Sequence, residues 1–179
     1  MVDWNVVVTV REDAFTRVFR LFSEFGKVRR AGYYNVFVLK VEDRRRFLDS
    51  LSGLLATDPD LLKAVSRVMP AEIVFTFQDR ESFEAQARAA ALEWLPRLAG
   101  MSLHVRMHRR GFHEQISSPD EERFLAEAIL ERLEDRGTPG RITFEDPDAI
   151  LDVDTVDNRA GLALWTREEL SRYPFLNLD

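Results

Sequence analysis

The first 70 residues alternate between short apolar runs and longer stretches in which every third or fourth residue is apolar. The short runs are rich in valine and predict buried strands, whereas the longer stretches predict amphipathic helices. Pro59, after Asp58, is expected in the first turn of a further helix. The order is typical of a ferredoxin-like, split βαβ arrangement. The predicted elements are strands over residues 5–10, 34–41 and 71–77, and helices over residues 11–25, 43–55 and 59–68.

The rest of the chain repeats this alternation of helices and strands. A capping box formed by Ser118 and Glu121 is expected to begin a long helix, and a second one, formed by Thr166 and Glu169, a short terminal helix. The pattern as a whole predicts an α/β fold of the α+β type. The predicted elements are helices over residues 80–95 and 118–136, and strands over residues 103–107, 150–156 and 162–165, the last two joined by a turn at residues 157–158.

The composition predicts a soluble, folded protein. Of the 179 residues 45% are hydrophobic, and 13 Phe and 3 Trp supply enough apolar bulk for a core. The absence of cysteine excludes disulfides, thiolate zinc sites and a cysteine nucleophile, and is compatible with a reducing cytoplasm. The N-terminus lacks the basic residues of a signal peptide, and no apolar run approaches the roughly 18–20 residues of a membrane helix. We therefore expect a cytoplasmic protein with no membrane partner.

A row of cations along the strand predicted at residues 103–107 is the most informative feature. Successive side chains of a strand point to opposite faces, so Leu103, Val105 and Met107 are expected in the core. The opposite row contains no acid, and an Arg side chain offers phosphates a bidentate fork. The alternative is that these cations pair with nearby acids such as Glu121 and Glu122. The row consists of His104, Arg106, His108 and, if the strand continues, Arg110, with Arg109 at its end.

The remaining charges are segregated along the chain. Basic clusters at residues 27–30 and 44–46 are typical of solvated surface, and residues 145–157 hold six acids with no Lys or Arg between them. The net charge of −6 argues against indiscriminate nucleic-acid binding. It leaves room for a local phosphate-binding face.

No catalytic or metal-binding motif stands out. Three histidines, His104, His108 and His113, are conceivable metal ligands, but Arg106 between the first two would repel a divalent ion. Asp152 and Asp154 share a strand face and could hold Mg²⁺, yet no glycine-rich phosphate loop accompanies them. A nucleophile elbow, a Walker loop and a dinucleotide fingerprint are also absent. We therefore predict no catalytic residues, no metal and no cofactor.

Three segments resemble the second half of a THUMP domain. Residues 103–111 match a strand that ends in basic residues and Gly, the helix from Ser118 follows, and residues 146–153 match an N/D-P-D-x-x-apolar-x-V strand. The tail, at residues 161–167 and 172–176, is similar to stand-alone THUMP proteins related to the adaptor of tRNA cytidine acetylation. In those proteins the THUMP domain commonly follows a ferredoxin-like region. The resemblance implies a ferredoxin-like region at residues 1–70 and a THUMP domain with a mixed sheet at residues 71–179.

The resemblance also implies a function, which is RNA binding. THUMP domains occur in tRNA-modifying enzymes, where they engage the acceptor end of tRNA. Carried over by the resemblance are Arg106, Arg109 and Arg110 as phosphate contacts, with His108 on the same strand. We add Arg159 and Arg167 as candidates because they flank the last hairpin as positive charges beside the acidic stretch.

We therefore predict a non-catalytic RNA-binding protein that binds tRNA, has no DNA partner, and assists a separate tRNA-modifying enzyme, with cytidine acetylation as the suggested reaction. The two regions would use the whole length, which is why an adaptor is expected in place of a catalyst. The alternative is a protein-interaction module that docks a partner through its acidic face.

Overall fold

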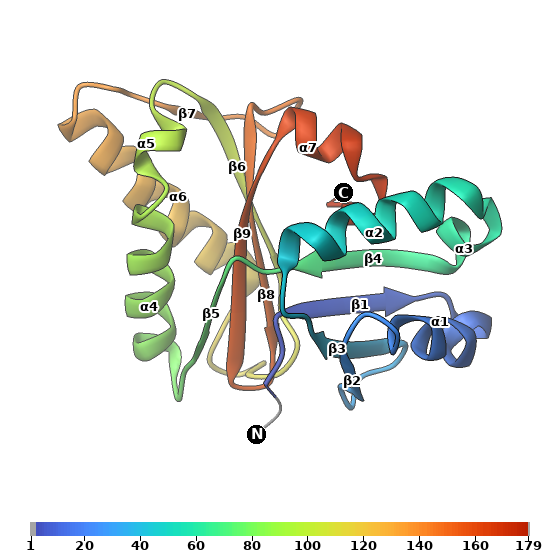
Figure 1. The fold of residues 1–179 in the computed structure, drawn as a ribbon. Coiled ribbons are helices and arrows are strands. Elements are labelled where there is room, and N and C mark those ends of the chain that lie inside the picture. Colours follow the sequence, from blue (N-terminus) through green and yellow to red (C-terminus); the bar gives the residue numbers. More distant parts are fainter. Residues whose placement is uncertain (1–2, 179) are drawn as a thin grey trace. The chain divides into compact units, whose positions relative to one another are not determined.

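The computed structural model describes residues 3–178 and divides into two compact units (Figure 1). The first unit contains residues 3–72 together with residues 170–178, and the second contains residues 73–169. Both units combine helices with a sheet, which confirms the predicted α/β class.

The first unit has the ferredoxin-like order of elements. Its four strands form a sheet in the order β2-β3-β1-β4, and every neighbouring pair is antiparallel. Asp43 and Asp58 cap two helices by accepting hydrogen bonds from backbone N–H groups. The elements are β1 (Val6–Val10), α1 (Phe15–Phe22), β2 (Lys27–Arg30), β3 (Val36–Lys40), α2 (Arg44–Thr57), α3 (Pro59–Ala64) and β4 (Val65–Pro70).

A cluster of phenylalanine rings forms the core of this unit. Phe22 of α1 meets Phe37 of β3 edge to face, with centroids 5.5 Å apart, and Phe47 of α2 lies 6.2 Å from Phe22. All three side chains are buried. As the sequence pattern predicted, the helical spacing of Phe15, Phe19 and Phe22 places all three rings on the face of α1 that packs against the sheet.

One helix end predicted for this region was wrong, and one predicted strand is present but belongs to the other sheet. The helix expected to reach residue 68 ends at Ala64, and residues 65–70 form β4, which pairs with β1. The strand predicted at residues 71–77, which had completed the ferredoxin-like order, is β5 (Ile73–Thr76) of the second unit.

The C-terminal tail corrects the predicted domain division. Residues 170–178 belong to the first unit, whereas the prediction had placed them in the THUMP region. The physical reason is burial, because Phe175 and Leu176 of a 3₁₀ turn pack on β4. The Tyr173 hydroxyl adds a 3.4 Å hydrogen bond to Asp49 of α2.

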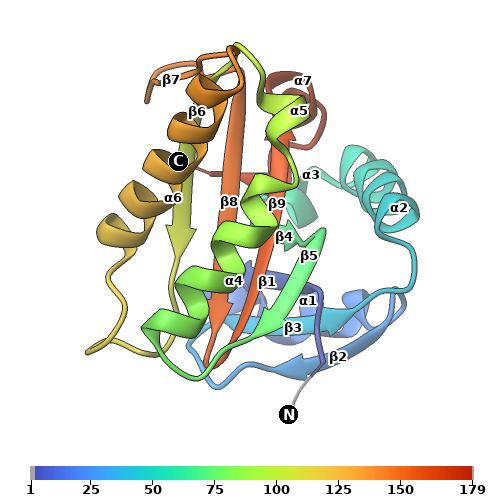
Figure 2. The same cartoon turned by 90° about the vertical axis from the view of Figure 1, so that its left-hand side faces the viewer.

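The second unit is a mixed sheet of five strands in the order β5-β9-β8-β6-β7. Strand β6 runs parallel to β7 and β8, while β9 is antiparallel to β8 and β5. Helices α4 and α6 lie across one face of this sheet (Figure 2). The further elements are α4 (Arg80–Leu92), α5 (Leu95–Leu98), β6 (Ser102–His108), α6 (Ser118–Asp135), β7 (Arg141–Ile142), β8 (Ala149–Val156), β9 (Arg159–Thr166) and α7 (Arg167–Arg172).

The two predicted capping boxes differ in outcome. At Thr166 the box is confirmed, because the Thr166 N–H donates to Glu169 Oε2 (2.9 Å) and the Glu169 N–H donates to Thr166 Oγ1 (3.2 Å). At Ser118 it is wrong: Ser117 is the N-cap residue of α6 and makes no side-chain cap. Glu121 is instead fully buried and faces Arg80 of α4.

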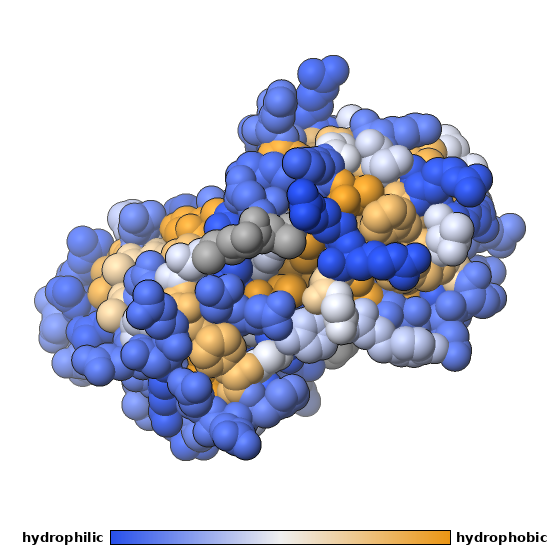
Figure 3. Space-filling view, turned by 90° about the horizontal axis from the view of Figure 1, so that it is seen from below, coloured by the Kyte–Doolittle hydropathy of each residue, from blue (hydrophilic) through white to orange (hydrophobic). Residues whose placement is uncertain are grey.

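No helix within residues 3–178 combines the length and the apolar character that a membrane crossing requires. Hydrophobic side chains reach the surface in separate patches between hydrophilic ones (Figure 3). Among the described residues, the large hydrophobic side chains that stand exposed are Tyr34 (73%) and Phe144 (76%).

Candidate nucleic-acid interface

The strand predicted to carry the RNA contacts is β6, and its two faces differ as expected. Leu103, Val105 and Met107 are buried in the core beneath the helices, while His104, Arg106 and His108 are partly exposed on the opposite face. The parallel neighbour β8 adds what the sequence did not reveal. Its register places Asp152 beside Arg106 and Asp154 beside His108, so acids from 46 residues further along the chain meet the row of cations.

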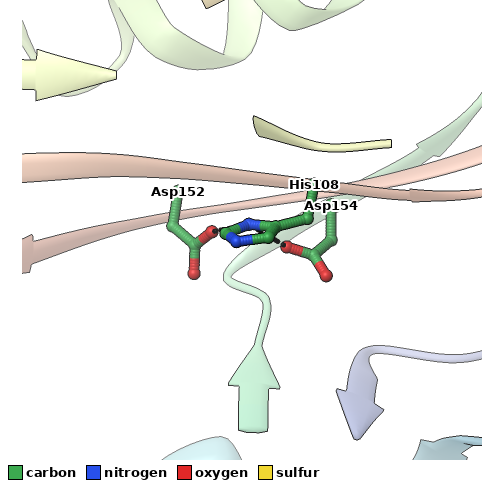
Figure 4. Close-up of side chains that lie close together, drawn as sticks. All are labelled: His108, Asp152 and Asp154. Carbon is green, nitrogen blue, oxygen red and sulfur yellow. Dashed lines mark ion pairs between the residues drawn. The ribbon is translucent and has the colours of Figure 1, made fainter. Parts of the chain in front are cut away.

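His108 lies between the two aspartates (Figure 4). Its Nδ1 is 3.6 Å from Asp154 Oδ1 and 4.0 Å from Asp152 Oδ1, and both carboxylates are fully buried. The Trp165 indole N–H also donates to Asp152 Oδ2, at 3.4 Å. His108 is therefore tied into a buried polar cluster, which limits the reach of its ring toward a ligand.

Arg110 belongs to the same cluster. Its Nη1 donates to Asp154 Oδ2 at 2.9 Å, and its side chain is only 14% exposed. The backbone continues the strand pairing, because the Arg110 N–H donates to the Thr155 carbonyl and the Asp157 N–H donates to the Arg110 carbonyl. Arg110 thus compensates a buried carboxylate as well as adding positive charge to this end of the strand.

Arg109 shapes the turn that follows β6. Its Nη1 donates to the Gly111 carbonyl at 2.7 Å and lies 2.7 Å from His113 Nδ1. Gly111 and Phe112 both have positive φ, and a side chain that bridges the turn stabilises this shape. The guanidinium remains partly exposed beside the strand end.

The structure gathers five of the six predicted RNA-binding residues and separates the sixth. Arg159 is the first residue of β9 and pairs with Val156, at the end of the sheet where Arg110 lies. Arg106, His108 and Arg109 lie on β6 or directly after it. Arg167 lies just beyond the other end of β9, about 26 Å from Arg159 at ~3.3 Å per residue.

Arg167 serves a structural clasp formed by the Asp146-Pro147-Asp148 motif. Its Nε donates to Asp146 Oδ1 (2.7 Å), and its Nη2 lies 3.3 Å from Asp148 Oδ1. Asp148 and Ser102 exchange two further bonds, Ser102 N–H to Asp148 Oδ2 (2.8 Å) and Asp148 N–H to Ser102 Oγ (2.9 Å). The bond from the Ser102 N–H lowers the pKa of Asp148. The motif that suggested the resemblance therefore joins the starts of β6 and β8 to the end of β9.

The acidic stretch at residues 145–157 does not form one exposed face. Asp152 and Asp154 are fully buried, and Asp148 is engaged in the clasp. Glu145, Asp146 and Asp157 remain exposed.

His108, Asp152 and Asp154 bring together residues that the sequence analysis had considered for metals separately. One atom from each lies within 4.8 Å of the other two, and a His–Asp–Asp set suits a divalent ion. However, Arg110 already contacts Asp154, and the His108 ring itself lies against both carboxylates. The cluster therefore has a purely structural explanation.

Sequence reasoning missed an aromatic contact on the outer side of β6. Phe144, 76% exposed in the loop before β8, meets the His104 ring edge to face at 4.8 Å. Burial, followed by the charge of Arg106, lowers the pKa of His104, so this imidazole is neutral at pH 7. The exposed Phe144 ring, against His104 and thus on the side of β6 that carries Arg106, offers a surface on which an unpaired base can stack. The only signal in the sequence was a Phe standing among polar residues.

The mixed five-stranded sheet and the ferredoxin-like unit that precedes it in the sequence define a THUMP-like fold. Three solved structures share it: PH1313 from Pyrococcus horikoshii (TM-score 0.61, 10% identity), TrmN from Thermus thermophilus (0.59, 20%) and a 4-thiouridine synthetase in complex with RNA and ATP (0.59, 14%). They match 90%, 89% and 92% of this chain, which itself spans only 54%, 44% and 42% of theirs. No model of a known protein family matches the sequence, and no curated protein does.

Proposed function

We propose that the chain is a non-catalytic RNA-binding protein that binds tRNA and assists a separate tRNA-modifying enzyme, with cytidine acetylation as the suggested reaction. The observation that carries the proposal is the outer side of β6, where the partly exposed Arg106 follows His104, whose ring meets Phe144 edge to face. A cation for phosphates beside a ring for bases is the usual combination for unpaired RNA.

The fold supports this reading by analogy. One structure with the same fold was solved as an RNA complex, and others are named TrmN and a putative methyltransferase complexed with SAH. Because one fold can carry many different functions, the shared fold makes RNA binding an expectation but does not say which residues bind.

A binding titration with total tRNA at low salt tests the proposal. We expect a complex at micromolar concentration whose log Kd rises with log salt, because each phosphate contact releases counterions. Arg106→Ala should weaken binding and reduce that slope by about 0.7–0.9. Phe144→Ala should weaken it by roughly 5- to 100-fold, the usual range for one stacked base.

Arg88→Ala is the matched control for these variants. Arg88 is an exposed arginine on α4, within the helical layer of the same unit, so its loss changes the net charge equally. If Arg88→Ala and Arg106→Ala weaken binding to the same extent, then only the net charge matters and the β6 site is wrong.

The accessory role is tested separately. Incubating tRNA with the chain and acetyl-CoA, S-adenosylmethionine or ATP should leave all nucleosides unchanged by mass spectrometry. A modified nucleoside would show that the chain is itself an enzyme.

A protein-interaction module remains the second candidate, because residues 73–169 carry 12 Lys and Arg against 20 Asp and Glu. The same titration separates the two candidates. No complex with tRNA at tens of micromolar protein would favour the module (affinity scale from).

A further inference from the structure

The two units differ strongly in charge, and the positive one is not the unit that holds β6. Residues 73–169 have a net charge of −8, whereas the rest of the chain has 13 Lys and Arg against 11 Asp and Glu, a net charge of +2. An RNA ligand is a polyanion, so the first unit is the less repulsive surface for it.

Three exposed cations of the first unit lie close together on β2. This strand lies at the edge of its sheet and pairs only with β3 among the described strands. Lys27, Arg29 and Arg30 are all exposed, and no carboxylate of residues 3–178 lies within ion-pairing distance of them. Charged side chains commonly protect an edge strand against pairing with other strands, which explains their presence but leaves them available to a ligand.

Arg30 is held in a defined position by aromatic rings. Its guanidinium carbon lies 4.5 Å from the centroid of the Phe15 ring and 5.9 Å from that of Phe19. Because the planar group is stacked, it is oriented and loses less side-chain freedom when a ligand binds.

A hollow of about 420 Å³ adjoins Arg30, and the loop between β2 and β3 forms its other wall. Tyr34 stands at this wall with 73% of its surface exposed. The loop is well defined, because Gly32 and Asn35 have positive φ and the Asn35 carbonyl accepts from the Val10 N–H of β1. Asn35 also lines the hollow, which places an amide near the ring.

The Tyr34 phenol is neutral at pH 7. The Glu12 carboxylate, first as a hydrogen-bond partner, raises the pKa of this phenol. The exposed ring therefore offers a ligand an uncharged aromatic face.

We propose that this hollow binds an unstacked nucleobase of single-stranded RNA, with the base on the Tyr34 ring and beside Arg30. Lys27 and Arg29 alternate with Arg30 along β2 and point to the other face of the sheet, so they would contact the adjoining phosphates where the RNA passes around this edge strand. The proposal rests on the RNA-binding function above and assigns it a second site, on the first unit, with a preference for unpaired nucleotides. Stacking on exposed aromatic rings next to a cationic track is how proteins bind single strands without reading their sequence.

The test uses the full chain and a short single-stranded RNA that carries one 2-aminopurine, whose fluorescence is quenched by stacking. We expect the wild type to bind the RNA and to quench its fluorescence. Tyr34→Ala should bind roughly 5- to 100-fold more weakly and lose the quenching. Tyr34→Phe should keep an affinity and a quenching close to those of the wild type. Since Tyr34 is exposed, the urea unfolding curve of Tyr34→Ala should match that of the wild type.

The phosphate contacts have their own pair of variants. Lys27→Ala with Arg29→Ala should reduce the slope of log Kd against log salt by about 1.4, at ~0.7 per contact for a single strand. Arg45→Ala with Arg46→Ala removes two exposed cations from α2 of the same unit and should change the slope little.

Several results would overturn the site. One is an unchanged affinity of Tyr34→Ala, and another is equal affinity of the wild type for a duplex of the same length. If tRNA binding depends on Phe144 and Arg106 but not on Tyr34, the proposed function stands and this second site falls. If the wild type binds neither tRNA nor the single strand, both proposals fall together.

Discussion

Glu121 gives the sharpest prediction about stability. Its side chain, in the first turn of α6, is fully buried, and its Oε1 lies 3.0 Å from Arg80 Nε on α4. The same nitrogen lies 2.9 Å from Glu84 Oε1, so two carboxyl groups share one cation. Burial, and then the charge and hydrogen bond of Glu84, raise the pKa of Glu121 to about 7.

The direction of the pH effect follows from this shift. In the unfolded chain a glutamate has a pKa of about 4.3, so between about pH 4.5 and pH 7 the folded state holds the extra proton. A group with a raised folded-state pKa contributes less to stability as the pH rises through that window. At ~1.4 kcal/mol per pKa unit, the loss is about 3 kcal/mol.

The variant Glu121→Gln keeps the shape of the side chain and removes its titration. We expect its free energy of unfolding, relative to the wild type, to rise by about 3 kcal/mol between pH 4.5 and pH 7.5. Urea unfolding at a series of pH values, followed by tryptophan fluorescence, measures this difference. Glu127→Gln, at an exposed position on the same helix, controls for the loss of one negative charge. A difference between Glu121→Gln and the wild type that stays constant with pH would refute the reasoning.

Two further stability predictions follow from close contacts. Arg110→Ala removes a charge-assisted bond to the buried Asp154 and should cost about 2 kcal/mol in urea unfolding, whereas a melt identical to the wild type would contradict the role of Arg110 in the buried cluster. Gly26→Ala should destabilise the first unit by more than ~1 kcal/mol, because the new Cβ would collide with the Lys40 carbonyl. Gly53→Ala, where α2 leaves open space, should be neutral or stabilise by up to ~1 kcal/mol, and the reverse order of these two variants in thermal melts would be evidence against the packing described.

Local patterns predicted most elements because each helix or strand buries one face. The alternation in β6 and the phenylalanine spacing in α1 were sufficient to place the core side chains of both. Strand β4 was missed because its apolar residues, Val65, Val68 and Met69, also suit a helix over so short a run. Pairing with β1 and cover by residues 174–176 decide its structure, and neither is visible locally.

The cations of the candidate site could be predicted from the sequence, but the acidic residues that they contact could not. The sequence placed Arg106, His108 and Arg110 on one side of a strand, and the structure agrees. Asp152 and Asp154 reach them only through the parallel pairing of β6 with β8, which depends on the whole sheet. The edge-to-face contact of Phe144 with His104 and the hollow beside Tyr34 likewise depend on loop geometry that no periodicity describes.

The most direct test of the central claim is ultraviolet cross-linking of the full chain to tRNA, followed by mass spectrometric identification of the linked peptides. RNA binding through the two sites predicts adducts on the peptides that contain Phe144 and Tyr34, competed away by unlabelled tRNA and reduced at high salt. A folded protein that yields no competed adduct at tens of micromolar would contradict RNA binding by this chain.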